Sequence, residues 1–371
     1  MLKNKVSVSQ LALLILLVMM GGKFLTLPSI LAEDVGHDSW LVICFAFLWD
    51  AICLAFLLWA VKINTSNLSF DSVVNLTLSK WACKPILIVF FVLFVSKIIV
   101  LLDSCYKTFA VTFDVNTNWI LFVIPIMAVA GFAIYRGFNS IARVSQVLFA
   151  LIILSIIAIL IYPITKTQFA SLTPIGEAGW GNIVGTAFNH SFWFSDYIFI
   201  YFVFGDIKRS KKLFSPVFVS FSVGVAMTVL LNAVFVALFG SFAPNVDIAM
   251  SKIGLFALST SSVGRWDWLT FTVWLTSVII KVIVYTFCAY RCIEKLFERY
   301  FRGVNLFVMG ALTLLLMLPM FISATTFVQT FVQWCILPFA LVQYLLPLLM
   351  PLLTGIATKK SQKEVVTNEQ S

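Results

Sequence analysis

The sequence is poor in charged residues. Only 11% of its 371 residues are Asp, Glu, Lys or Arg, whereas a soluble domain averages about 25%. Hydrophobic residues make up 61% of the chain, and the mean hydropathy is +1.03. This composition excludes a soluble globular domain. It predicts an all-α polytopic membrane protein, because a helix satisfies its own backbone hydrogen bonds inside the bilayer.

The residues used in metal and nucleophile chemistry are scarce as well. The chain has two histidines, and its seven cysteines are scattered without a CxxC spacing. That pattern argues against a zinc site or a disulfide framework and favours cysteines that pack as small apolar residues. The sequence also has no phosphate-binding glycine loop and no hydrolytic triad. We therefore predict a protein that is not an enzyme, with no catalytic residues, no metal and no cofactor.

The long hydrophobic runs predict ten spans, since a transmembrane helix needs about 20 mostly apolar residues. The predicted spans are roughly 7–31, 40–61, 85–107, 118–135, 143–163, 181–204, 213–240, 268–290, 304–322 and 326–353. They form a single transmembrane domain over residues 1–357, followed by a cytoplasmic tail over 358–371 that we expect to be disordered.

The basic residues are unevenly divided between the two sides of the membrane. With the N-terminus inside, 18 of the 25 Lys and Arg residues fall in inside segments and 4 fall in outside segments. This bias follows the positive-inside rule, so we expect a multi-pass protein with both termini in the cytoplasm. The net charge of +9 then reflects membrane orientation, and no nucleic-acid partner is expected.

The ten spans also suggest an internal repeat. The starts of helices 1–5 and 6–10 pair at offsets of 173 to 186 residues, which gives repeats of about 7–163 and 181–353 with inverted topology. Inverted repeats with broken helices at matching positions are typical of transporters whose site lies at the repeat interface. Gly21-Gly22-Lys23 interrupts helix 1, and the polar and aromatic run 189–196 lies in the middle of helix 6. We predict that both helices are broken.

Four motifs carry a resemblance to a known family. They are Gly21-Gly22-Lys23-Phe24-Leu25-Thr26-Leu27-Pro28, Gly176-Glu177-Ala178-Gly179-Trp180, Gly205-Asp206-Ile207-Lys208-Arg209, and Gly264-Arg265-Trp266-Asp267 with the later Trp274. Through them the chain resembles the B-type subunits of spore germination receptors, a branch of the amino acid–polyamine–organocation transporter superfamily.

The resemblance implies a leucine-transporter-like arrangement of ten helices. It also implies a small nutrient ligand, such as an amino acid, bound near the breaks of helices 1 and 6 together with helices 3 and 8. The implied partners are A- and C-type receptor subunits, and the implied location is the inner membrane of a spore. The chain departs from the family pattern at Lys23, which stands where the helix 1 motif has its second glycine.

Lys23 lies beside the predicted break of helix 1. Its ammonium could pair with a ligand carboxylate near the positive dipole end of the second half-helix, or it could form a structural ion pair with a nearby aspartate. Gly21 and Gly22 could expose the backbone to a ligand or allow close helix packing. We include these three residues and Phe24 among the candidate ligand-binding residues.

Three more charged residues lie in the middle of predicted spans: Asp50 in helix 2, Lys97 in helix 3 and Lys281 in helix 8. A lone charge in the bilayer is costly, so residues of opposite charge should meet. Lys97 is a candidate ligand contact. Asp50 and Lys281 are candidates for ion coupling, in which Lys281 supplies a protonatable charge, or for a permanent structural bridge to each other.

Helix 6 contributes the remaining candidates. His190 and Asp196 could relay a proton or hold a ligand amine, or they could be structural groups. Ser191 and Ser195 could bond backbone groups that the break sets free. Trp193 could form the wall of an apolar pocket or pack in the core.

Two functions follow from these features. The first is a nutrient-sensing membrane subunit whose ligand shifts a transporter-like fold between two states. The second is a proton-coupled amino-acid permease, which the repeat and Lys281 favour. A structural subunit that binds no ligand is a third, weaker reading.

Overall fold

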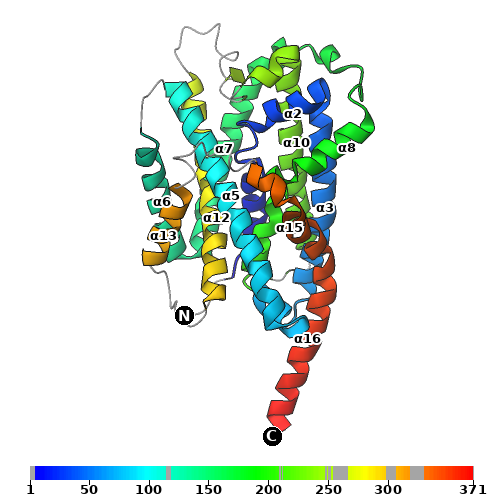
Figure 1. Ribbon diagram of the computed structural model, residues 1–371, viewed down its shortest axis with the longest axis vertical. Coiled ribbons are helices and arrows are strands. Elements are labelled where there is room, and N and C mark those ends of the chain that lie inside the picture. The colour runs from blue at the N-terminus through cyan, green and yellow to red at the C-terminus, as the bar shows by residue number, and fades with distance from the viewer. Residues whose placement is uncertain are drawn as a thin grey trace.

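The computed structural model describes residues 5–113, 118–208, 210, 212–246, 249, 252, 253, 266–297, 306–317 and 330–370 (Figure 1). Within these ranges the chain is helical, apart from turns and an isolated β-bridge between Val6 and Ile207. The α-helices are α1 (Val8–Met20), α2 (Leu27–Val35), α3 (Ser39–Ile63), α4 (Phe70–Thr77), α5 (Lys80–Phe113), α6 (Trp119–Arg136), α7 (Phe138–Lys166), α8 (Trp180–Asn189), α9 (Ile200–Val203), α10 (Phe214–Phe239), α12 (Trp266–Leu296), α13 (Leu306–Met317), α15 (Ile336–Ala340) and α16 (Leu346–Gln370).

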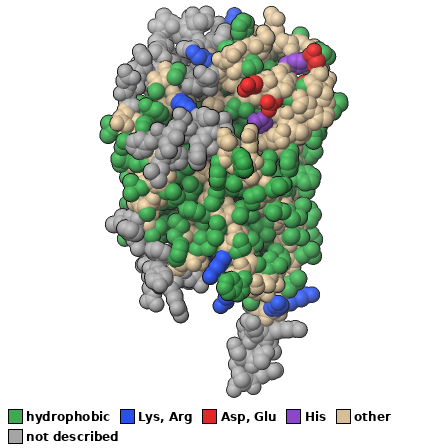
Figure 2. All heavy atoms as spheres, in the orientation of Figure 1, with side chains coloured by type: hydrophobic (Ala, Val, Ile, Leu, Met, Phe, Trp, Pro, Cys, Tyr) green, Lys and Arg blue, Asp and Glu red, His purple; other side chains and the backbone are tan. Residues whose placement is uncertain are grey.

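Seven helices in the described ranges are long and apolar enough to cross a bilayer, and two shorter apolar helices accompany them. A broad band of hydrophobic side chains covers the middle of the molecular surface in Figure 2, with Lys and Arg both below and above it and Asp, Glu and His above it on the same face. These observations confirm an all-α polytopic membrane protein. The count of ten spans and the inverted repeat stay predictions.

The first helical interruption lies between α1 and α2. α1 begins with a capping box in which Ser7 and Gln10 bond each other's backbone, and it ends at Met20. Gly22 then adopts a φ of +85°, a conformation that glycine reaches without a steric penalty. α2 starts at Leu27 with Pro28 in its first turn, where the missing N–H costs nothing. A short connection of non-helical backbone therefore joins the two helices.

The second interruption lies between α8 and α9. α8 ends at Asn189, and two short 3₁₀ turns, Ser191–Trp193 and Asp196–Phe199, follow it. Between these turns Ser195 has φ 62° and ψ 33°, in the left-handed region. A left-handed conformation costs a residue other than glycine about 1–2 kcal/mol, so neighbouring contacts must hold Ser195 there.

The two interrupted segments lie side by side in the centre of the helical bundle. α1 packs against α10, α7 and α12, while α12 packs along α5. The chain that leads into α1 pairs with the chain that leaves α9: the Val6 amide donates to the Asp206 carbonyl, and the Lys208 amide donates to the Val6 carbonyl, both at 2.9 Å. Side chains from α5, α12 and both interruptions therefore meet at one place.

The predicted disordered tail needs correction. α16 continues through residues 358–370 and projects beyond the rest of the molecule as the lowest element in Figure 1. A preformed helix extends without a new nucleation step, and the Lys, Gln and Glu residues of this segment have good helix propensity. The polar composition of the tail alone did not reveal this continuation.

Candidate functional site

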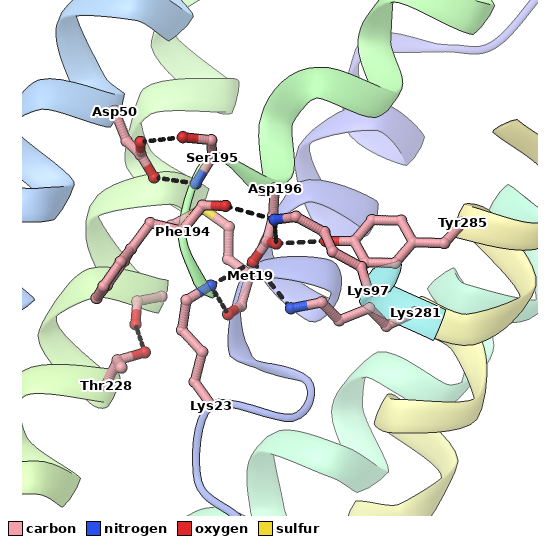
Figure 3. Close-up of polar contacts among 11 residues, drawn as sticks. Met19, Lys23, Asp50, Lys97, Phe194, Ser195, Asp196, Thr228, Lys281 and Tyr285 are labelled. Carbon is pink, nitrogen blue, oxygen red and sulfur yellow. Dashed lines mark hydrogen bonds and ion pairs between the residues drawn. The ribbon is translucent and has the colours of Figure 1, made fainter. Parts of the chain in front are cut away.

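Asp196 is the centre of a buried group of charged side chains (Figure 3). Its carboxylate pairs with the Lys23 ammonium and accepts a hydrogen bond from the Tyr285 hydroxyl. The ammonium of Lys281 lies 3.0 Å from one carboxylate oxygen, and that of Lys97 lies 3.6 Å from the other. We call these five residues the lysine cluster. They bring together both helical interruptions, α5 and α12.

Two of the lysines also bond carbonyl groups at the interruptions. The Lys23 ammonium donates to the Met19 carbonyl at 2.9 Å, and the Lys97 ammonium donates to the Phe194 carbonyl at 2.6 Å. The last carbonyls of an α-helix have no partner within the helix, and a positive charge there is favoured by the helix dipole. Lys23 therefore closes the end of α1 while it pairs with the second interruption.

Asp50 lies beside the lysine cluster and bonds the same interruption. Its carboxylate accepts hydrogen bonds from the Ser195 backbone amide at 2.8 Å and the Ser195 hydroxyl at 3.0 Å. Both residues are buried, at 1% and 0% exposure. These bonds hold Ser195 in its left-handed conformation, directly before Asp196 in the chain.

The structure does not contain the Lys281–Asp50 bridge that the sequence left open as one alternative. Lys281 pairs with Asp196 and not with Asp50, whose carboxylate oxygens accept from Ser195. The physical reason is the second interruption, which exposes the Ser195 amide to Asp50 and turns Asp196 toward α12. For Lys23, the geometry is that of the structural ion pair with a nearby aspartate.

Gly21 and Gly22 have separate reasons to be glycine. A Cβ on Gly21 would lie 3.0 Å from the Ser277 carbonyl oxygen and 3.4 Å from the Cβ of Lys281. The absence of a side chain at this position therefore allows α1 to pack closely against α12. A Cβ on Gly22 would lie 2.3 Å from a methyl carbon of Leu101, in addition to the strain from its positive φ. The first glycine permits packing and the second permits the turn.

The buried charges near Asp196 do not balance. Three lysines, Lys23, Lys97 and Lys281, face two aspartates, Asp50 and Asp196, so the five groups would carry a net charge of +1 when all of them are ionised. All five residues are at most 4% exposed. Burying an uncompensated charge is costly, so a further anionic group would stabilise this region.

A cavity of about 630 Å³ opens above the lysine cluster, at the end of the molecule that carries α2 and α8. Its lining includes Glu33, Asp34 and His190, and the last two are in hydrogen-bond contact at 2.6 Å. Phe192 and Trp193 line both this cavity and a space of about 10 Å³ next to Lys97 and Lys281. That space is about large enough for one water molecule. The two aromatic side chains therefore separate the cavity from the cluster.

The predicted site residues divide into three groups. The first group belongs to the lysine cluster or lies beside it: Lys23, Lys97, Asp196 and Lys281 in the cluster, and Asp50 and Ser195 next to it. The second group lines the cavity and consists of His190 and Trp193. The third group is buried around the interruptions and consists of Gly21, Gly22, Phe24 and Ser191. Sequence reasoning missed Tyr285 and Asp34 as functional candidates. Tyr285 lies four residues after Lys281 and so on the same face of α12, which is a signal that could have found it.

Solved structures with a similar fold include a manganese transporter from Eremococcus coleocola in complex with an aromatic bis-isothiourea substituted compound. The TM-score is 0.55 at 11% sequence identity, and the match covers 95% of this chain and 85% of the transporter. Two single-residue mutants of that transporter match with TM-scores of 0.53 and 0.52 at the same identity and coverage. This likeness confirms the predicted fold class, a helical transporter fold of the leucine-transporter-like kind.

No curated protein matches the sequence. Residues 5–325, however, match the family described as spore germination protein, which covers most of the chain. This match confirms the resemblance that the four motifs carried, and together with the transporter fold it places the chain among membrane permeases that are not enzymes. The chain belongs to the spore germination protein family.

Proposed function

We propose that this protein is the nutrient-sensing membrane subunit of a spore germination receptor and that its ligand is an amino acid or a similar carboxylate. The observation that carries the proposal is a 630 Å³ cavity that ends just above a buried cluster with an excess of positive charge. This volume is within the range of small-molecule sites in proteins.

The ligand carboxylate would bind Lys97 and Lys281. These two lysines, unlike Lys23, border the small space below Phe192 and Trp193. Because that space holds about one water molecule, at least one of the two aromatic side chains must move before a carboxylate reaches the lysines. Ligand entry is thereby linked to a change at the second interruption, as a sensor requires.

A ligand amine would find acidic groups in the upper cavity. Glu33 and Asp34 line it on α2, and His190 lines it directly after the end of α8. A zwitterionic ligand therefore matches both ends of the path from the cavity to the cluster. A divalent cation matches the cluster poorly, because three lysines surround Asp196 and, among the described residues, no group of three or more His, Cys, Asp or Glu side chains is placed to bind a metal.

The receptor role includes A- and C-type subunits as partners and the inner membrane of a spore as the location, with both termini in the cytoplasm. Membership of the spore germination protein family supports this assignment. In such a complex the ligand-dependent change is passed to the partner subunits and does not need to complete a transport cycle.

Calorimetry on the purified full-length protein, with the amino acids offered one at a time, tests the ligand class. Lys97→Met removes one charge-assisted hydrogen bond, worth about 1.5–3 kcal/mol, and should weaken binding by roughly tenfold or more. Lys84→Met, which changes an exposed lysine on the same helix, is the matched control and should bind normally. Normal affinity in Lys97→Met would contradict the proposed carboxylate contact.

Uptake by liposomes that contain only this protein distinguishes a sensor from a permease. We expect binding without accumulation of the bound amino acid. Robust accumulation in the absence of partner subunits would overturn the sensor function in favour of the proton-coupled permease. In cells, Lys23→Ala should change nutrient responsiveness at a normal protein level, because it removes the link between the two interruptions.

A further inference from the structure

Asp50 differs from Asp196 in having no cation paired with it. Among the described residues it forms no ion pair within 4.0 Å, whereas Asp196 has three. Its two hydrogen bonds both come from Ser195. A buried carboxylate without a paired cation is costly to keep ionised, so Asp50 is the acidic group of this region best suited to exchange a proton.

The protonation state of Asp50 affects the lysine cluster through Ser195. An ionised carboxylate makes stronger hydrogen bonds than a neutral one. When Asp50 is ionised, its bonds hold Ser195 in the left-handed conformation, which is strained for a residue other than glycine. Ser195 lies between Phe194, whose carbonyl binds Lys97, and Asp196, whose carboxylate binds the three lysines. Weaker hydrogen bonds between Asp50 and Ser195 therefore weaken the lysine contacts of both neighbouring residues, Phe194 and Asp196.

A second observation shows where a proton could enter. Tyr197 donates its hydroxyl hydrogen bond to the Gln343 carbonyl in the π-helical turn Leu341–Leu345. Both amide atoms of the Gln343 side chain and the hydroxyl of Tyr201 are buried without a hydrogen-bond partner in the described part of the chain. An unsatisfied buried polar group costs about 1–3 kcal/mol, so these groups are expected to bind internal water.

One of these unpaired groups, the Tyr201 hydroxyl, belongs to a residue that borders a second cavity. Tyr201 follows Tyr197 by about one helical turn and lines a cavity of about 90 Å³ together with Asp71 and Lys295. The volume is large enough for several water molecules. The lysine excess of the inside segments places this cavity on the predicted cytoplasmic side.

We propose that Asp50 is a proton-binding site reached from the cytoplasmic side along Tyr201, Gln343 and Tyr197. A hydronium ion in the lower cavity gives up its proton through ordered water to the Asp50 carboxylate, which becomes a neutral carboxyl, and the reverse transfer returns the proton to water. Proton binding weakens the hold on Ser195. The protein thereby gains an acid-sensitive state that does not depend on the identity of its nutrient ligand.

The other titratable groups near Asp50 come from every element around it. They are Cys53 on its own helix, Lys97 on α5, Lys23, Asp196 and Tyr197 at the interruptions, Tyr285 on α12 and Tyr344 in the π-helical turn. Of these, Lys23 opposes protonation of Asp50 and Asp196 favours it. Asp196 is itself held ionised by three lysines, so the exchange of one proton falls to Asp50.

Infrared difference spectroscopy tests the proposal on the full-length protein in lipid nanodiscs. A change from mildly alkaline to mildly acidic buffer should produce the C=O stretch of a protonated carboxyl. Labelling with ¹³C-aspartate should move this band, and Asp50→Asn should remove it. Ser195→Ala, in a protein that keeps Asp50, should shift the frequency of this band, because the Ser195 hydroxyl no longer donates a hydrogen bond to the Asp50 carboxyl. This variant keeps the test decisive if Asp50→Asn does not fold. A band unchanged by both variants would overturn the proposal.

Rates after a pH jump test the route. Tyr201→Phe and Gln343→Leu should each slow the appearance of the Asp50 band by about tenfold, as expected for an added barrier near 1.4 kcal/mol. Tyr135→Phe, which alters an exposed tyrosine on α6, is the matched control and should leave the rate unchanged. Wild-type rates in both route variants would show that protons reach Asp50 by another way and would overturn the inferred path.

Discussion

Replacing Asp196 by asparagine tests how much its negative charge, which pairs with all three lysines of the lysine cluster, contributes to the stability of the protein. Asp196→Asn keeps the size of the side chain and an acceptor for the Tyr285 hydroxyl, but it removes the carboxylate that the three lysines share. Asp50 is not placed to replace it, because its oxygens bond Ser195 and, among the described residues, no ammonium lies within 4.0 Å of them. Breaking one side of a buried ion pair typically costs about 3–5 kcal/mol, and we expect a destabilisation in that range.

A second substitution turns this loss into a quantitative test. The single variant raises the excess positive charge near Asp50 from one to two, and adding Lys281→Met returns it to one. Lys281 is suited to this role because its ammonium bonds only Asp196 within the cluster. The double variant should therefore recover part of the lost stability, with a coupling energy of about 1–3 kcal/mol between the two positions.

Thermal unfolding of the detergent-solubilised full-length protein measures both effects, with the single variants, the double variant and the wild type compared in one buffer. Asp103→Asn is the control. Asp103 is buried but pairs with Lys107, whose side chain is 49% exposed and open to water, so its loss should cost less than the loss of Asp196. Strictly additive losses in the double variant, or an Asp196→Asn protein as stable as the wild type, would refute the charge argument.

Two further predictions concern the backbone around the site. Gly22→Ala should lower the stability by at least about 2 kcal/mol, from the positive φ and from the overlap with Leu101, and Gly22→Ala combined with Leu101→Ala should regain only the part due to the overlap. Asp38→Ala should increase the mobility of the loop before α8, because the Asp38 carboxylate accepts hydrogen bonds from the amides of Gly176 and Ala178 at 2.9 and 3.0 Å. Limited proteolysis should then cut this loop faster than in the wild type. An unchanged cleavage rate would contradict this role of Asp38.

The sequence contained enough information for the membrane class. Composition and hydrophobic length decide whether a chain enters a bilayer, and these are properties of single segments. The glycine pair at residues 21–22 similarly acts through local backbone freedom and close packing. Such features can be predicted because they do not depend on which distant residue becomes a neighbour.

The pairing of the buried charges could be predicted only in part. The cost of an unpaired charge in the bilayer indicated that Asp50, Lys97 and Lys281 needed partners, but not which partners. The conformation of Ser195 determines which charges pair, because its left-handed backbone turns its amide toward Asp50 and leaves Asp196 facing the lysines. A strained conformation of a single serine has no pattern in the sequence, since its contacts to distant residues stabilise it.

The contacts between the two interrupted helices explain why a small ligand could control the whole fold. They are joined at three levels: by backbone bonds of Val6 at the lower end, by Lys23 and Asp196 in the middle, and by Asp34 and His190 at the upper end. The upper pair is partly exposed and therefore weak. The middle pair is buried, so separating the helices there is costly. A ligand shifts such an equilibrium only by its differential affinity for the two states. A carboxylate that offers the neighbouring lysines a new acceptor supplies that difference at the level where the two helices are held most strongly.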